Sequence, residues 1–255
     1  EVILVEAKLD FANLEGADLR NANLQGVDFR KANLIETKFQ GANLRNAKIQ
    51  GADLSFSNLS KANLQGSELS NVNWKGANIG HANLKGVDLR NANLQGVDFR
   101  FANLTKANLE NASLAKANLR SSILQYADLT KASLEFASLQ GAIFAKAKLK
   151  GANLAGASLN HASLKGADLF EAILVGSALE GADLRFANLH GANLNGTIGL
   201  SCFWIKNATI SNTTVLPSYI SIEGFPVVLE TKETVIREEG CSRDMETASD
   251  THISQ

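Results

Sequence analysis

A five-residue alternation of hydrophobic and polar positions runs through most of this 255-residue chain. From Val2 to Gly196 it continues for 39 consecutive units without an insertion or a deletion. The third residue of a unit is Leu in 32 units and Phe, Ile or Trp in the other seven. The first residue is Ala in 29 units and otherwise Val, Ser or Thr. Because polar residues avoid the third position altogether, the small first and large third side chains are expected to point into a common core.

A period of five matches neither the 3.6-residue period of a helix nor the two-residue period of a strand as a long element. It predicts a chain that turns a corner every five residues. The second residue is Asn or Asp in 24 units, and the fifth is Gly in 16. Since these residues adopt turn and left-handed dihedrals at low cost, they are expected at the corners.

Units such as Ala12-Asn-Leu-Glu-Gly16, Ala62-Asn-Leu-Gln-Gly66 and Ala192-Asn-Leu-Asn-Gly196 show the repeat in its purest form. The pattern resembles the pentapeptide-repeat family, whose motif is approximately (Ala/Ser/Thr/Val)-(Asp/Asn)-(Leu/Phe)-X-X. The resemblance covers residues 2–196 and implies an all-β fold, a right-handed quadrilateral parallel β-helix with four units per coil. The 39 units would then form nearly ten 20-residue coils of a solenoid.

The domain organisation follows from where the register ends, after Gly196. We expect residues 1–200 to form the repeat β-helix, residues 201–229 a C-terminal cap, and residues 230–255 a polar acidic tail that is largely disordered. The residues expected to cover the last coil are Phe203, Trp204 and Ile205.

One segment of eleven residues, RNANLQGVDFR, occurs at both Arg20–Arg30 and Arg90–Arg100. A separation of 70 residues is three and a half coils, so the copies should lie on opposite faces. A binding site duplicated for avidity would recur at a multiple of 20. We therefore interpret the repeat as a copied structural segment.

Charge distinguishes the four faces of the expected rod. Face 1, whose central residues run from Leu4 to Leu184 in steps of 20, carries six cations and two acids, a net of +4. The best-known activity in the family is protection of gyrase by an acidic, DNA-shaped rod, and such mimicry needs phosphate-like negative charge. The repeat region nets +4, which disfavours this role. Binding of nucleic acid to face 1 is also disfavoured, because six cations form a sparse stripe.

Outward apolar residues are the candidate contacts. Ile123 and Ile143 occupy second positions 20 residues apart and should stack, with Tyr126 nearby, so these three residues form a candidate partner contact. The C-terminal tail is expected to cover a second group, which comprises Phe170, Ile173, Val175 and Phe186. Corner packing is expected for four fifth-position aromatics, which are Phe11, Phe56, Phe101 and Phe136.

The sequence offers no catalytic, cofactor or metal site. His81 and His161 share a face but stand four coils apart, ~19 Å at a β spacing, which is too far for one metal ion. Glycine recurs as the fifth residue of a unit rather than in a phosphate-binding loop. A rod filled with leucine is also expected to lack a concave apolar pocket. The chain is therefore predicted not to be an enzyme.

The sequence gives only weak information about the cellular compartment and about the two ends of the rod. No apolar run approaches the roughly 20 residues needed to cross a bilayer, and no secretory pattern is present, so a cytoplasmic location is expected. Unpaired thiols are the favoured interpretation of Cys202 and Cys241, because a disulfide would need an oxidising compartment. The N-terminal end has no cap, which indicates either a missing upstream segment or a homodimer through that end.

These features favour a non-enzymatic rigid scaffold that contacts a protein partner not identified by the sequence. One alternative is a DNA-mimicking protector of a type II topoisomerase, and another is a repeat module of a larger effector or regulator with an upstream domain. The family resemblance further implies a bacterial, and in particular a cyanobacterial, source.

Overall fold

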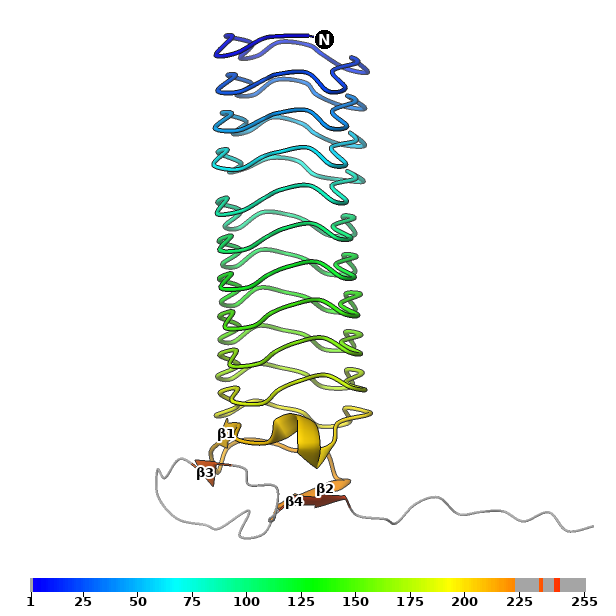
Figure 1. Ribbon diagram of the computed structural model, residues 1–255, viewed down its shortest axis with the longest axis vertical. Coiled ribbons are helices and arrows are strands. Elements are labelled where there is room, and N and C mark those ends of the chain that lie inside the picture. The colour runs from blue at the N-terminus through cyan, green and yellow to red at the C-terminus, as the bar shows by residue number, and fades with distance from the viewer. Residues whose placement is uncertain (1, 223–233, 236–240, 244–255) are drawn as a thin grey trace, which may run out of the picture.

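A computed structural model describes residues 2–222, 234–235 and 241–243 and shows a rod of stacked coils that starts at the N-terminus (Figure 1). Parallel β-bridges join second-position residues that are 20 apart, beginning with Ile3 to Asn23 and ending with Ala178 to Ile198. One coil is therefore four units, as the sequence predicts. The two copies of RNANLQGVDFR, 70 residues apart, lie on opposite faces.

The core lies along the axis of the rod. Third-position side chains from Leu24 to Leu194 are at most 1% exposed, and first-position side chains from Ala22 to Ala192 are at most 4% exposed. Burial of each third-position side chain contributes roughly 1.5–3 kcal/mol to stability. Four buried hydroxyls at first positions, those of Thr37, Ser57, Ser67 and Ser122, donate to backbone carbonyls at 2.5–2.9 Å, whereas those of Ser177 and Thr197 have no partner among the described residues.

Backbone hydrogen bonds follow one scheme in every regular unit. The third and fifth N–H groups donate to the coil that follows, the second N–H donates to the coil that precedes, and the first N–H of the next unit closes the turn. For the unit Ala22–Gly26 the acceptors are the carbonyls of Asn43 (2.8 Å), Arg45 (2.8 Å), Val2 (2.9 Å) and Leu24 (3.2 Å). The fourth N–H has no backbone acceptor in this scheme.

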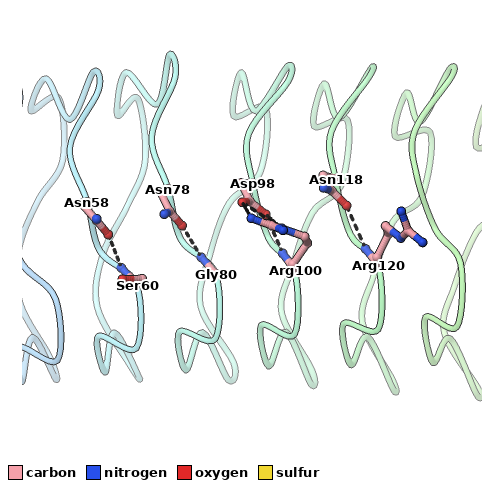
Figure 2. Close-up of polar contacts among 8 residues, drawn as sticks. All are labelled: Asn58, Ser60, Asn78, Gly80, Asp98, Arg100, Asn118 and Arg120. Atoms are coloured by element: carbon pink, nitrogen blue, oxygen red, sulfur yellow. Dashed lines mark hydrogen bonds and ion pairs between the residues drawn. The ribbon is translucent and has the colours of Figure 1, made fainter.

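Second-position Asn and Asp side chains supply that missing acceptor. In all 24 units that carry one, its side-chain oxygen accepts the fourth-position N–H at 2.9–3.4 Å. Figure 2 shows four such bonds on successive coils, from Asn58 to Asn118. The prediction that these residues form the corners is therefore wrong: they lie in the bridged segments and accept a hydrogen bond that the fold otherwise leaves unmade.

The corner itself is the fifth residue. All 39 fifth positions have positive φ, and 23 of them are not glycine. In 38 of the 39 corners the next first-position N–H donates to the third-position carbonyl and closes a type II turn, which requires φ above zero at the fifth residue; the corner at Asn71 lacks this bond. Glycine satisfies this requirement without steric cost, as the sequence predicts for its 16 units.

The hydrogen-bond ladder is interrupted at one level of the rod. Between residues 66–76 and the coil that follows, seven ladder bonds of the described scheme are absent; their donors would be the N–H groups of Gly66, Leu69, Asn71, Trp74, Gly76, Asp88 and Asn93. Figure 1 shows a wider gap between coils at this height, where cyan passes into green. Trp74 is the largest third-position side chain and is fully buried, with its indole Nε1 unpartnered. The missing bonds coincide with this bulky side chain, and we infer that Trp74 overpacks a core spaced for leucine.

Beyond Gly196 the chain forms short irregular elements beneath the last coil (Figure 1). β1 (Thr209–Ile210) pairs with β3 (Thr234–Val235), and β2 (Ile220–Ile222) pairs with β4 (Cys241–Arg243), both antiparallel. Thr209 and Val215 bridge to the last coil at Asn188 and Asn193. The short helix η1 (Cys202–Ile205) precedes these strands.

The side chains that close this end differ in part from those expected. Ile205 is fully buried, but Phe203 is 51% exposed and packs edge-on against Trp204. The additional fully buried side chains of this segment are Leu200, Ala208 and Ile210.

The described residues of the tail form two short strands, β3 and β4, which pair with β1 and β2. The expectation that residues 230–255 are largely disordered stays a prediction. The rest of residues 223–255 lies outside the described residues. Cys202 is disulfide-bonded, and Cys241 is the sequence's only other cysteine, so the interpretation of unpaired thiols is wrong.

Candidate interaction face

Face 1 holds all three predicted contact residues. A parallel bridge joins Ile123 to Ile143 on adjacent coils, so the two side chains stack as expected, and both are half-buried. Tyr126 stands on the corner at the edge of the same face and is 52% exposed. The second-position side chain is apolar in both units, so this stretch lacks the polar oxygens that line most of the rod.

A groove of about 400 Å³ opens beside Tyr126 and extends to Phe186. Small residues create it: Ala145 stands at a fourth position and Gly166 at a fifth, where neighbouring coils carry long side chains. The sequence predicted no concave apolar pocket. That prediction is wrong, because the hollow forms outside the leucine core, where two adjacent coils lack bulk.

Lysine ammonium groups lie over the aromatic ends of the groove. Lys146 Nζ lies 5.8 Å from the centre of the Tyr126 ring, and Lys165 Nζ lies 5.7 Å from that of Phe186. These distances suit a cation–π contact. The groove therefore combines apolar walls with positive charge.

Arg185 and Asp183 form an ion pair beside the groove. The guanidinium lies 2.7 Å from the carboxylate, and this hydrogen bond holds the pKa of Asp183 below its usual value. Arg185 also lies over Phe203 and Trp204, at 5.7 and 5.4 Å from the ring centres. Asp183 is the acidic residue of face 1 in these coils, and its charge is therefore already neutralised by Arg185.

The second apolar group remains open in the part of the chain that the structure describes. Ile173, Val175 and Phe186 are 41%, 37% and 56% exposed, so the described tail strands do not cover them. Phe170 is half-buried, with the Lys150 ammonium 4.6 Å from its ring centre. The rest of the tail, which was expected to cover this group, lies outside the described residues.

Aromatics at the other corners pack along the rod, which confirms the prediction of corner packing. A Cβ added at Gly76 or Gly156 would lie 2.7 or 2.6 Å from the ring of Phe56 or Phe136 on the preceding coil. Two further rings stack on a neighbouring side chain: Phe101 on His81 (4.7 Å between centres) and Phe11 beneath Lys31 (5.3 Å to the ring centre).

Acidic side chains along the rod are mostly engaged in structure. Five aspartates form close ion pairs with the arginine two residues later, at 2.6–2.7 Å: Asp18, Asp28, Asp88, Asp98 and Asp183. Within the described ranges, no group of three or more His, Cys, Asp or Glu residues could hold a metal ion. No helix among the described residues is long and apolar enough to span a membrane.

The fold and the repeat place the chain in a family. A model of pentapeptide repeats matches it in eight copies, whose ranges include 3–41, 37–73, 75–111, 102–135, 112–151, 127–166 and 162–198. The chain belongs to the pentapeptide-repeat family. Its fold is accordingly the right-handed quadrilateral β-helix that the resemblance implies.

Three solved structures of pentapeptide repeat proteins are similar to this chain to different extents. HetL, a pentapeptide repeat protein involved in heterocyst differentiation regulation in the cyanobacterium Nostoc sp. strain PCC 7120, is 31% identical over 84% of this chain and 91% of its own, with a TM-score of 0.60. Rfr23 of the cyanobacterium Cyanothece 51142 is 33% identical over 43% of this chain and 63% of its own, with a TM-score of 0.32. QnrB1, a plasmid-mediated fluoroquinolone resistance protein, is 20% identical over 83% of this chain and 92% of its own, with a TM-score of 0.36. No curated protein matches the chain.

Proposed function

We propose that this protein is a non-enzymatic, rigid scaffold that binds a protein partner through face 1 between Ile123 and Phe186. One observation carries the proposal: the stacked isoleucines, the exposed Tyr126 and the groove lie together on one face. Contiguous apolar surface with a polar rim is typical of protein contact sites. Four exposed corner aromatics elsewhere on the rod, Phe11, Phe56, Phe101 and Phe136, each lie against a neighbouring corner residue.

The rod suits this role because its faces are fixed by the backbone. Apart from the interrupted level at residues 66–76, the coils are joined by ladder hydrogen bonds on all four faces, and they pack on a continuous core. When a partner docks on such a surface, few groups of the rod lose conformational freedom, so the entropic cost of binding is small. The same argument applies to a free-standing rod and to a repeat module of a larger effector or regulator.

DNA mimicry is the weaker alternative. A phosphate-like surface needs unneutralised carboxylates in a row. Along this rod, five aspartates are each paired with an arginine, and the repeat region nets +4. A gyrase supercoiling assay with the purified protein is expected to show neither inhibition nor protection from a quinolone.

The test compares two double variants at matched positions on opposite faces. Ile123→Lys/Ile143→Lys alters face 1, and Ser113→Lys/Ser133→Lys alters bridged, half-buried second positions on the opposite face. Each variant and the wild type are immobilised, and proteins captured from the native lysate are quantified by mass spectrometry. We expect a partner that the face 1 variant loses at least tenfold and the opposite-face variant retains.

The proposal fails if both variants capture the same proteins to the same extent. Size-exclusion chromatography with light scattering separates a foreign partner from a second copy of the chain. A wild-type dimer that becomes monomeric only in the Ile123→Lys/Ile143→Lys variant would make the partner a second copy.

A further inference from the structure

The geometry of the groove points to a partner of defined chemistry. We propose that it binds an acidic peptide segment that inserts one apolar side chain between Tyr126 and Phe186. This inference rests on the proposed function and specifies which kind of partner face 1 recognises.

The apolar anchor follows from the shape of the site. Tyr126 and Phe186 are 52% and 56% exposed and stand at opposite ends of a hollow of about 400 Å³. Ala145 and Gly166 lie between them and offer no side chain that fills the space. A pocket of this volume accommodates an aromatic or a branched aliphatic side chain.

The acidic character follows from charge. Lys146 and Lys165 are exposed at the groove, and neither forms an ion pair with any described carboxylate. Asp183 is held by Arg185. Carboxylates that flank the anchor would reach both ammonium groups, whereas a basic segment would be repelled, so charge sets the specificity of the site.

Glycine corners differ in how far a neighbouring side chain covers them, from the open corners at Gly86 and Gly176 to the covered corner at Gly156. At Gly156 the preceding corner residue is Phe136, whose ring covers the glycine with carbon atoms 2.6 Å from an added Cβ. At Gly166 the preceding corner residue is Lys146, and the nearest atom to an added Cβ is its Cγ at 3.7 Å. The lysine extends over Tyr126 instead and leaves the surface open.

Spacing favours a peptide over single-stranded nucleic acid. Tyr126 and Phe186 are three coils apart, ~14 Å at the spacing of β-strands, so adjacent bases could not stack on both rings. Positive charge at the groove is also confined to two unpaired lysines, which is too little for a phosphate track.

The experiment uses a displayed library of random dodecapeptides, selected against the full wild-type chain. Groove variants are Lys146→Glu/Lys165→Glu and Gly166→Phe. Phenylalanine already occupies five corners, at φ of 55–62° close to the 65° of Gly166, so this substitution fits the fold while filling the hollow. The matched controls are Lys75→Glu/Lys116→Glu on the opposite face and Gly86→Phe on the same corner, where an added Cβ meets nothing within 4 Å.

We expect selected peptides to carry Asp or Glu around one Trp, Phe or Leu. Their affinity should fall at least tenfold in both groove variants and stay within twofold in both controls. A 12-nucleotide single-stranded DNA should bind more weakly than these peptides. Circular dichroism spectra and melting curves of each variant establish that it is folded.

The inference is overturned if no peptide is enriched, if the enriched peptides are basic or lack an apolar residue, or if the groove variants bind as wild type does. Tighter binding of the DNA would overturn it in favour of nucleic acid. If the native partner is lost with Ile123→Lys/Ile143→Lys but kept by Lys146→Glu/Lys165→Glu, the scaffold function stands and the acidic-peptide inference alone fails.

Discussion

Each position of the repeat meets a separate backbone or packing need at the residue scale. The first and third residues fill the core, the second supplies an acceptor to the fourth N–H, and the fifth adopts left-handed φ. The second-position requirement is the least visible in the sequence, because Asn and Asp also favour turns. Only the accounting of donors and acceptors separates the two roles.

Removal of one second-position acceptor should destabilise the rod measurably. In Asn108→Ala the Glu110 N–H loses its acceptor, which lies at 3.1 Å, and the free energy of unfolding should fall by about 1 kcal/mol. Urea unfolding followed by circular dichroism measures this loss. Ser133→Ala is the control, because the described structure shows no side-chain hydrogen bond from Ser133, and its effect should stay within about 0.5 kcal/mol. Equal effects would refute the capping role.

Corner glycines should differ according to the ring above them. Gly156→Ala brings a methyl group against the Phe136 ring, whereas Gly176→Ala meets nothing within 4 Å at nearly the same φ. Both carry the cost of left-handed alanine, about 1 kcal/mol, and Gly156→Ala should lose about 1 kcal/mol more. Thermal melts compare the two variants. Removing the ring in Phe136→Ala/Gly156→Ala should abolish the additional penalty, and persistence of that penalty would contradict the contact.

The coil is the element of this fold, and its regularity made it predictable. An unbroken five-residue register fixed the four faces, and with them the stacking of Ile123 on Ile143. The interruption of the hydrogen-bond ladder at Trp74 was not predicted, because tryptophan is a hydrophobic residue that a core can accept. The interruption depends on the space available between two particular coils, which the sequence does not give.

Relief of the overpacked level should stabilise the protein. Trp74→Leu removes the excess volume and the unpartnered indole N–H, each of which costs on the order of 1–3 kcal/mol, and lets the absent ladder bonds form. The loss of buried indole surface opposes part of this gain. We expect a net increase of about 1 kcal/mol in the free energy of unfolding and slower amide exchange at Leu69 and Asn71.

Phe99→Leu provides the comparison, since Phe99 is fully buried in a level with intact bonds. It should lower stability by about 1 kcal/mol, as large-to-small core substitutions do. If both leucine variants are destabilised alike, Trp74 does not strain the rod.

At the scale of the whole molecule, aspartate–arginine pairs couple stability to pH. Hydrogen bonds from Arg20 and Arg30 lower the pKa values of Asp18 and Asp28 to about 2, from a usual value of 3.8. Since the folded pKa is depressed, this contribution is present above pH 4 and is lost as the pH falls from about 4 towards 2. Asp18, Arg20 and Arg30 are exposed to solvent, and Asp28 is half-buried beside an exposed arginine, so the effect is modest.

Thermal melts between pH 7 and pH 2 check this dependence. The melting temperature should vary little between pH 7 and pH 5 and fall below pH 4. In Asp18→Asn/Asp28→Asn the amide still caps the fourth N–H but no longer titrates, so the fall should be shallower. An unchanged acid transition would assign the pH dependence to other groups.

The shape of the surface was only partly predictable from the sequence. Face assignment located Tyr126 and the cations of face 1, because position in the repeat fixes direction. The groove depends on where neighbouring side chains turn: Lys146 extends over Tyr126, while Phe136 covers Gly156. The directions of these side chains are set by contacts between coils, so the five-residue pattern does not predict them.

The central claim, that the rod binds its partner through face 1, is tested most directly by hydroxyl-radical footprinting of the protein in native lysate and in buffer. Three aromatic side chains at other corners serve as internal controls for oxidation. Phe11, Phe56 and Phe136 are 69%, 56% and 64% exposed. Tyr126 and Phe186 are comparably exposed, at 52% and 56%. We predict that the lysate protects Tyr126 and Phe186 from oxidation at least threefold and leaves the other three unchanged. Equal protection at all five rings, or protection at Phe56 and Phe136 alone, would contradict this account.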